Sequence, residues 1–130
     1  MASVSCIISP RAAEVRGNHI SNTVPPIWFE EARVPLYPEI ERATSPVARL
    51  GVVRRAIYDY QRELFHGGDV EIRTSVKSIG NSSAVFFQEA WQFDKLAMTA
   101  ETVIVMIDGS TNQKLAISEQ GRELLAALKL

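Results

Sequence analysis

The sequence predicts an α+β fold in which a curved antiparallel sheet of about five strands wraps one long helix, followed by a C-terminal helix. Apolar residues recur at helical spacing from residue 24, and from residue 51 onward they alternate with polar residues as they do in strands. The strand-like segments follow one another through short turns, which favours antiparallel pairing, and a single apolar helix needs a curved sheet to cover it. We expect one domain over residues 1–130.

Composition excludes several functional classes. Hydrophobic residues at 46% and charged residues at 22% are typical of a soluble globular domain, and a net charge of −1 gives no support for nucleic-acid binding. The apolar runs are far shorter than the roughly 20 residues that span a membrane, and no signal-peptide pattern opens the chain. The single cysteine, Cys6, cannot form an internal disulfide and fits a reducing cytoplasm. We therefore expect a cytoplasmic protein that binds neither nucleic acid nor membranes.

The first predicted element is a strand over residues 3–14. Pro10 favours an edge position or a bulge for it, because proline cannot donate a ladder hydrogen bond. Cys6 lies inside this strand with no histidine near it in sequence, so we interpret it as a structural thiol rather than a nucleophile. Gly17 and Asn18 end the run and begin a polar loop.

The polar loop leads into the predicted helix. Asn22 or Thr23 can cap it, and Pro25 and Pro26 suit the first helical positions, where a missing N–H costs nothing. One face is apolar throughout, carried by Val24, Trp28, Ala32 and Pro35 or Leu36. We expect the helix to end around residues 36–40, because two further prolines disfavour its continuation, and residues 41–49 to form a polar connection.

Four strands and a final helix complete the prediction. The strands cover residues 51–64, 69–77, 83–93 and 96–108 and are separated by glycine-rich or polar turns. Ser118 can cap the last helix, which extends through Leu128. The last two strands are apolar on both faces, and one helix covers only one of them. We therefore expect a second subunit against the other face, in a homodimer or homotetramer.

Four segments in this order resemble the 4-hydroxybenzoyl-CoA thioesterase family: Asn18-His19-Ile20-Ser21-Asn22, Trp28-Phe29-Glu30-Glu31-Ala32-Arg33, Gly68-Asp69-Val70-Glu71-Ile72 and Gly80-Asn81-Ser82-Ser83. The resemblance implies the hot-dog fold and hydrolysis of an acyl-CoA thioester at a subunit interface. Coenzyme A then enters only as part of the substrate. No metal cluster, phosphate loop or dinucleotide fingerprint is present in the sequence, so no other cofactor is expected.

The chain departs from the family at one position. The family usually carries Asp-x-Asp-x-x-Gly-His, whose second aspartate acts as nucleophile or general base. An ungapped alignment places Val15 there, and a one-residue deletion places Arg16 there; neither can do that work. The nearest carboxylate is Glu14. Either Glu14 takes the role, or a helix carboxylate such as Glu31 does, or activity is weakened or lost.

Thioester hydrolysis needs a donor that stabilises the oxyanion and a carboxylate that attacks or activates water. A helix N-terminus supplies the donor, because its first amides lack partners and its dipole favours negative charge. Thr23 and Val24 carry the candidate amides, since Pro25 and Pro26 cannot donate. The alternative interpretation is an ordinary capped helix end.

The polar side chains around this point allow two interpretations each. Glu14, our first candidate for the carboxylate, also fits a solvated strand end, and Glu31, the second, also fits a salt bridge to Arg54 or Arg55. His19 either polarises the carbonyl or holds the loop, and Asn22 is a cap or a substrate contact. We expect the pair Glu30 and Arg33, three residues apart, to form a solvated ion pair.

The resemblance also indicates where substrate binds. Trp28 and the strand aromatics would line the acyl tunnel, and the family places the turn after the third strand near the nucleotide. Lys77, Asn81, Ser82 and Ser83 are therefore candidate ligands of the coenzyme A phosphates, although they equally fit an ordinary hairpin. Two other functions stay open: a non-catalytic acyl-CoA-binding or assembly module, and a purely structural oligomeric scaffold.

Overall fold

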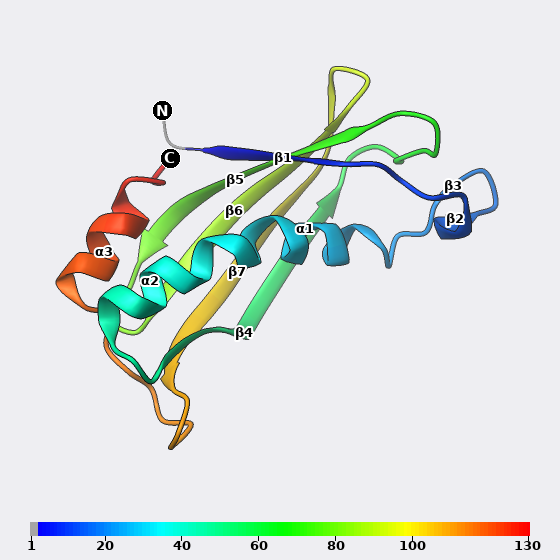
Figure 1. Cartoon of the computed structure of the whole chain (residues 1–130). Helices are drawn as coiled ribbons and strands as arrows, with labels where there is room; N and C mark the ends of the chain where they lie inside the picture. The colour runs from blue at the N-terminus through cyan, green and yellow to red at the C-terminus, as the bar shows by residue number, and fades with distance from the viewer. Residues whose placement is uncertain (1–2) are drawn as a thin grey trace.

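The computed structural model describes residues 3–130 and shows a five-stranded antiparallel sheet curved around a helical segment (Figure 1). The strands are β1 (Val4–Ile8), β4 (Ala48–Tyr60), β5 (Val70–Ile79), β6 (Ser83–Gln92) and β7 (Lys95–Asp108). Their order across the sheet is β1-β5-β6-β7-β4, and every neighbouring pair is antiparallel. The α+β architecture predicted from the sequence is confirmed.

The central helical segment is longer than expected. It consists of α1 (Pro25–Arg33), a 3-10 turn η2 (Val34–Leu36) and α2 (Tyr37–Thr44), so the helical segment continues past residue 40 and the expected polar connection over residues 41–49 begins with helix. Pro35 and Pro38 lie in the first turns of η2 and α2, where the missing N–H has no intrahelical partner to lose. The prolines therefore change the type of helix without ending the segment.

The N-terminal strand is shorter than expected. Instead of one strand over residues 3–14, β1 ends at Ile8, a 3-10 turn η1 (Ala12–Glu14) follows, and a small hairpin joins β2 (Val15–Arg16) to β3 (His19–Ile20). Pro10 follows the end of the pairing with β5. Gly17 turns the hairpin at a φ of +66°, a left-handed conformation that glycine adopts without steric cost.

The core lies between the helices and the inner face of the sheet. Trp28, Phe29 and Ala32 of α1 pack on one cluster with Ile72 and Met98, and the fully buried Phe29 ring stacks on Tyr58 with centroids 6.0 Å apart. Tyr37 and Ile40 of α2 belong to a second cluster. Burying each such side chain stabilises the fold by about 1.5–3 kcal/mol. The even-numbered residues of β6 are buried and the odd-numbered ones half-buried.

The C-terminal helix α3 (Glu119–Ala126) begins as expected, because the Ser118 hydroxyl oxygen accepts a hydrogen bond from the Gly121 amide at 2.9 Å. Leu125 is buried against the second cluster. Beyond α3 the chain pairs with β5: the Leu130 amide donates to the Val76 carbonyl at 3.0 Å. Figure 1 shows α3 beside the C-terminal end of α2, far from the β2–β3 hairpin at the start of α1.

Strand β4 forms one edge of the sheet, and among the strands of residues 3–130 it pairs only with β7. Its outer residues carry exposed apolar side chains: Val52, Val53, Ile57 and Tyr60 are 41–51% exposed. Two irregularities in register, after Leu50 and after Val53, interrupt the pairing with β7. Within residues 3–130, no helix is both long and apolar enough to span a membrane.

Candidate functional site

The loop before α1 is held by its own backbone and not by a side-chain cap. Val24, and not Asn22 or Thr23, is the N-cap residue, and it makes no side-chain capping bond, so the predicted cap is corrected. Ser21 forms the turn instead: its carbonyl accepts from the Val24 amide, and its Oγ lies 2.9 Å from Thr23 Oγ1. With Pro25 and Pro26 at the first helical positions, two of the usual orphan amides are absent, and a side-chain cap has less to satisfy.

The two predicted oxyanion donors differ in their hydrogen bonds. The Val24 amide donates to the Ser21 carbonyl at 3.0 Å, which is a normal hydrogen bond. The Thr23 amide has only a long contact of 3.4 Å to Ser21 Oγ. Of the two amides, that of Thr23 therefore has the weaker hydrogen bond to lose when it donates to a substrate oxygen. Its role as an oxyanion donor stays a prediction.

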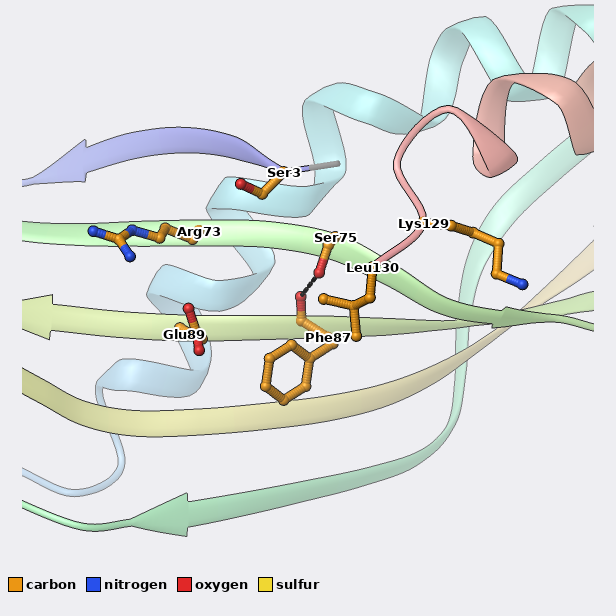
Figure 2. Close-up of a pocket in the computed structure, with 7 residues that line it drawn as sticks. All are labelled: Ser3, Arg73, Ser75, Phe87, Glu89, Lys129 and Leu130. Atoms are coloured by element: carbon orange, nitrogen blue, oxygen red, sulfur yellow. Dashed lines mark hydrogen bonds between the residues drawn. The ribbon is translucent and has the colours of Figure 1, made fainter. Parts of the chain in front are cut away.

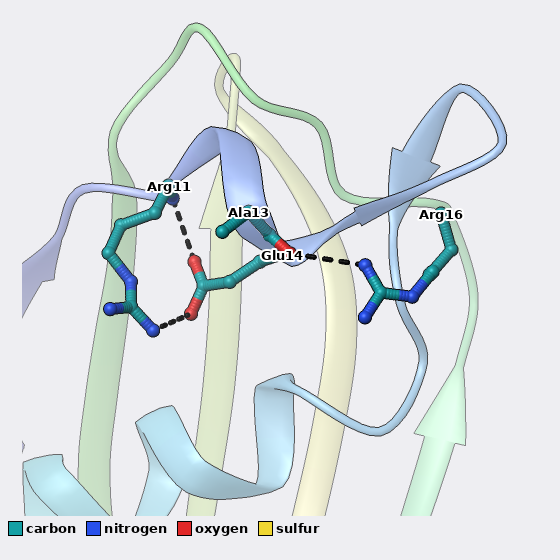
Figure 3. A network of polar contacts seen from close by, with 4 residues as sticks. All are labelled: Arg11, Ala13, Glu14 and Arg16. Atoms are coloured by element: carbon teal, nitrogen blue, oxygen red, sulfur yellow. Dashed lines mark hydrogen bonds and ion pairs between the residues drawn. The ribbon is translucent and has the colours of Figure 1, made fainter.

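Glu14 is engaged within its own turn, as Figure 3 shows. The Arg11 amide donates to Glu14 Oε1 at 2.7 Å, and the Arg11 guanidinium lies 3.4 Å from Oε2. The Glu14 carbonyl accepts a hydrogen bond from the Ser21 amide at 2.9 Å and so ties the turn to the loop before α1. The Glu14 side chain is 11% exposed. It therefore lies near the helix start as expected, and its carboxylate is held in place by Arg11.

His19 faces a carboxylate that the sequence did not single out. Its Nδ1 lies 2.8 Å from the Ile20 carbonyl oxygen, and its Nε2 lies 3.6 Å from Glu63 Oε2. Both side chains are partly exposed, at 36% for His19 and 57% for Glu63. Because Nδ1 can only donate to the Ile20 carbonyl oxygen, a hydrogen bond from Nε2 to Glu63 or to a substrate carbonyl requires a proton on Nε2 as well.

A cavity of about 290 Å³ opens at this pair. It is lined by His19, Ile20, Asn22, Tyr60, Gln61, Arg62, Glu63 and Leu64. The two walls are joined by hydrogen bonds, because the Ile20 amide donates to the Leu64 carbonyl at 2.7 Å and the Tyr60 hydroxyl donates to the Asn22 carbonyl at 2.6 Å. Asn22 therefore contributes its backbone to the wall of the cavity.

The sequence placed residues 60–64 at the end of a long strand, so Tyr60 and Glu63 were not recognised as site residues. The strand ends at Tyr60, and the following segment turns across the start of β7, where the amides of Gln61 and Arg62 both donate to the Ala97 carbonyl at 2.9 Å. The available signal was the polar run Gln61-Arg62-Glu63, which breaks the alternation expected of a strand.

Glu31 does not form the salt bridge that was its alternative interpretation. The ion pairs among residues 3–130 are Arg11–Glu14, His19–Glu63, Arg73–Glu71 and Lys77–Glu101, so neither Arg54 nor Arg55 pairs with Glu31. Glu31 instead lies near β1: burial raises the pKa of the Cys6 thiol, and the negative charge of Glu31 raises it further. A raised pKa keeps Cys6 protonated, which fits a structural thiol.

The expected ion pair of Glu30 and Arg33 is also absent from the described residues. Arg33 is 3% exposed, and its guanidinium donates inward, to the Tyr37 hydroxyl at 2.8 Å and to Gln88 Oε1 at 3.4 Å. Gln88 in turn donates to the Phe29 carbonyl and to Thr74 Oγ1, both at 2.9 Å. Helical spacing places Arg33 on the flank of the apolar face, and the sheet then covers it.

The predicted substrate-binding residues divide between two other places. Trp28 is 3% exposed and packs in the first core cluster. Lys77 Nζ forms an ion pair with Glu101 Oε2 at 3.0 Å. The turn that holds Asn81, Ser82 and Ser83 accepts backbone hydrogen bonds from β7 and from the segment just before α3. That turn follows Ile79, the last residue of β5. Val70, the first residue of β5, pairs with Ile8 at the end of β1, from which the chain continues toward α1. One chain therefore does not bring Lys77, Asn81, Ser82 or Ser83 to the helix start.

A larger hollow, of about 500 Å³, lies on the sheet face turned away from α1 (Figure 2). It is lined by Ser3, Arg73, Ser75, Phe87, Glu89, Lys129 and Leu130. The Arg73 guanidinium already has two partners there. Its Nη2 lies 3.1 Å from Glu71 Oε1, and its Cζ lies 4.4 Å from the centroid of the Trp91 ring. None of the residues predicted for catalysis lines this hollow. Within residues 3–130, no group of three or more His, Cys, Asp or Glu side chains could hold a metal ion.

Comparisons with known proteins agree with this fold. The family model of the thioesterase-like superfamily matches residues 16–128. A predicted thioesterase from Bacillus stearothermophilus superposes with a TM-score of 0.88 at 27% identity, and the match covers 99% of this chain and 98% of that one. The comparison with curated proteins gives no match.

Two further solved structures show the same fold at lower identity. DHNA-CoA thioesterase from Staphylococcus aureus gives a TM-score of 0.81 at 21% identity, covering 98% of this chain and 89% of that one. A thioesterase from Thermus thermophilus, described as complexed with coenzyme A and Zn, gives a TM-score of 0.81 at 22% identity, covering 96% of this chain and 93% of that one. The family resemblance and the hot-dog fold inferred from the sequence are confirmed.

Proposed function

The chain belongs to the thioesterase-like superfamily, and we propose that it hydrolyses an acyl-CoA thioester at the cavity beside the start of α1. The observation that carries the proposal is the juxtaposition of His19 and Glu63, 3.6 Å apart, on a cavity of about 290 Å³ that also touches the loop before the helix. A histidine, a carboxylate and helix-start amides are the groups that water-mediated acyl transfer requires. The Thermus thermophilus structure with coenzyme A lends support through its fold alone.

The proposed reaction places the thioester carbonyl oxygen near the Thr23 amide. A carboxylate takes a proton from water as the water oxygen attacks the carbonyl carbon, and the C–S bond breaks when the tetrahedral intermediate collapses. The products are the free acid and coenzyme A, whose thiolate takes up the proton. His19 orients the carbonyl or the carboxylate, and Asn22 shapes the loop through its carbonyl bond to Tyr60. Val24 is a second proposed oxyanion donor.

Three carboxylates are candidates for the base, and their surroundings rank them. Glu63 lines the cavity and faces His19. Glu14 lies near the helix start with both oxygens on Arg11, so it must release part of that contact to reach water. Glu31 lies on the side of α1 near Cys6. We propose Glu63 as the base, with Glu14 and then Glu31 as the alternatives.

We also propose that the active unit is a homo-oligomer. In the described part of the chain, the long edge strand β4 pairs only with β7 and carries exposed valine and isoleucine side chains, a surface suited to pairing with a second copy. Two conditions apply to the residues proposed to bind substrate. Such an assembly would have to bring a second copy's Lys77, Asn81, Ser82 and Ser83 to the site, and the core would have to open for Trp28 to reach the acyl chain. The single cysteine supports a cytoplasmic location as part of the same proposal.

A second candidate function is non-catalytic acyl-CoA binding. It is favoured by one feature of the sequence: Val15, or Arg16 if one residue is deleted, aligns with the aspartate of the resembled family, and the adjacent Glu14 carboxylate is bound to Arg11. A binder keeps the cavity and loses turnover. Fold alone does not separate the two functions.

The test is thiol release from short, medium, long and aromatic acyl-CoAs, measured for the wild type and for Glu63→Gln, Glu14→Gln and Glu31→Gln. Glu123→Gln, on an exposed position of α3, is the matched control. We expect Glu63→Gln to lose about 100-fold or more in kcat, which is the usual contribution of a general base. A loss confined to Glu14→Gln or Glu31→Gln would move the role to that residue. Binding without turnover of any acyl-CoA would leave the second function.

A further inference from the structure

A cavity of about 320 Å³ lies at the junction of α1 and α2, apart from the proposed catalytic cavity. Its walls come from the helical segment around the 3-10 turn η2 and from the start of strand β4. No residue lines both cavities, so the two are separate in the single chain. The volume is at the lower end of the range of small-molecule sites, which suits a compact ligand.

The side chain of Arg33 brings an unpaired charge to this cavity. It is 3% exposed and takes part in no ion pair within residues 3–130. A guanidinium has five N–H donors, and the hydrogen bonds of the described residues use only Nε, toward Tyr37, and Nη1, toward Gln88. In the same part of the chain, Thr102 Oγ1 is the one fully buried side-chain N or O atom without a partner. Arg33 Nη2, which has none, is therefore not sealed in the core, and the cavity gives access to it.

The hydroxyl of Tyr37 adds a second free donor on the same cavity. Its oxygen accepts a hydrogen bond from Arg33 Nε at 2.8 Å, and the described residues offer no acceptor for its own proton. Tyr37 is 5% exposed, so packing fixes the ring that carries this hydroxyl. A guanidinium with a neighbouring O–H is complementary to a carboxylate, which is acceptor-only and takes hydrogen bonds on both oxygens.

The start of β4 leaves room for a ligand beside the Tyr37 ring. Gly51 lies in a β-bulge, because the pairing with β7 shifts between Leu50 and Val52. It has a φ of +133°, a conformation that favours glycine, and a Cβ there would lie 3.4 Å from Tyr37 Cε2. Glu41 Oε2 accepts a hydrogen bond from the Leu50 amide at 2.8 Å and so fixes the bulge to α2. This wall of the cavity is therefore held in place by specific contacts.

We propose that this cavity binds a small organic acid, with the carboxylate on Arg33 and Tyr37 and the apolar body beside Val34. Attraction to the guanidinium is strong here, because little water screens a buried charge. Of the two acidic side chains on the cavity, Glu41 is engaged by the backbone of β4, and Glu30 is exposed, where water and salt screen its repulsion. The site requires no turnover by this protein, although the acid released in the proposed hydrolysis belongs to the same chemical class.

The first experiment measures binding of benzoate and hexanoate by titration calorimetry, with benzamide and hexanamide as uncharged probes of the same shape. We expect both acids to bind, and each amide to bind about tenfold more weakly or less, because an amide cannot pair with the guanidinium charge. Arg33→Gln should abolish the preference for the acids. Because Arg33 is buried, circular dichroism and urea unfolding check that this variant is folded.

Exposed positions on the cavity keep the test independent of core packing. Val34 is 44% exposed, and Val34→Glu places a negative charge on the cavity wall. It should weaken acid binding about tenfold, whereas Val34→Gln, its uncharged match, should change the affinity little. Glu30→Gln removes a negative charge and should strengthen acid binding about threefold. Glu39→Gln, at an exposed position of α2 outside the cavity, is its control and should leave the affinity unchanged.

Three results would overturn this inference. Equal affinities for the acids and their amides would show that no cation recognises the carboxylate. Acid binding that Arg33→Gln and Val34→Glu leave unchanged, and that His19→Gln removes, would place the acid in the catalytic cavity instead. Absence of binding by the wild type at concentrations up to about 10 mM would refute the site outright. None of these measurements uses thiol release, so the proposed hydrolysis is supported or refuted by its own assay.

Discussion

The Tyr60 hydroxyl donates a 2.6 Å hydrogen bond to the Asn22 carbonyl and thereby joins the end of β4 to the loop that launches α1. The two residues are 38 positions apart in sequence. Burial raises the pKa of Tyr60 above its ordinary value of 10.0, and the nearby Tyr58 raises it further, so the hydroxyl stays protonated and able to donate at neutral pH. This bond closes one side of the proposed catalytic cavity.

Tyr60→Phe removes this hydrogen bond and keeps the ring. Because the residue is half exposed, we expect a loss of only about 0.5–1 kcal/mol in the free energy of unfolding. We expect kcat/KM to fall by more than this free energy corresponds to, because the loop with His19 and Asn22 loses the hydrogen bond that joins it to β4. Urea unfolding and thiol-release kinetics measure the two effects. A loss of stability with unchanged kinetics would show that this bond does not position the site.

Arg33 and Tyr37 form a buried hydrogen-bonded pair, and Arg33 takes part in no ion pair within residues 3–130. Tyr37→Phe leaves the Arg33 Nε–H without its partner at 2.8 Å in a place that is 3% exposed, so we expect about 1–3 kcal/mol of destabilisation. Arg33→Met removes the charge but leaves the buried Tyr37 hydroxyl and Gln88 Oε1 without this donor, so we expect it to destabilise the protein as well. A double-mutant cycle by urea denaturation measures the coupling. Additive single effects would contradict this account.

The edge of β4 predicts the assembly. Val53 is 47% exposed in the single chain, and a lysine there would place a charge in any sheet that continues through β4 into a second copy. We expect Val53→Lys to shift the protein toward monomer in sedimentation equilibrium. Val47→Lys, at a residue 39% exposed just before β4, is the control. An unchanged mass for Val53→Lys would place the interface elsewhere, for example on the outer sheet face.

Glu71 makes the stability depend on pH in the acid range. The hydrogen bond from Arg73, and then that from Ser5, lowers its pKa below the ordinary value of 4.5. In the window between that ordinary value and the lowered one, the unfolded chain binds more protons than the folded chain, so stability falls as the pH falls. We expect the wild type to lose more stability than Glu71→Gln does as the pH falls below the ordinary value of 4.5. Parallel acid titrations of both proteins in urea check this, and equal slopes would contradict it.

The sequence by itself determined the architecture. The alternation in β5, the apolar face from Trp28 to Ala32 and the serine cap of α3 are local patterns, and local patterns specify which side of an element is buried. The same reasoning failed at element ends. Pro35 and Pro38 interrupt one type of helix without ending the segment, because each falls in the first turn of the next piece.

Only the tertiary structure decided which polar residues meet. Glu63 and His19, Tyr60 and Asn22, and Gln92 and Phe65 come from segments that no local pattern connects, and they meet because β4 and β6 end beside the loop before α1. Glu14 and His19 lie near the helix start, whereas Lys77 and the turn after it, which the sequence analysis named for the phosphates, lie elsewhere on the chain. That turn follows the last residue of β5, whereas the first residue of β5 pairs with the end of β1. The length of the strand therefore separates the turn from the segments near the helix start.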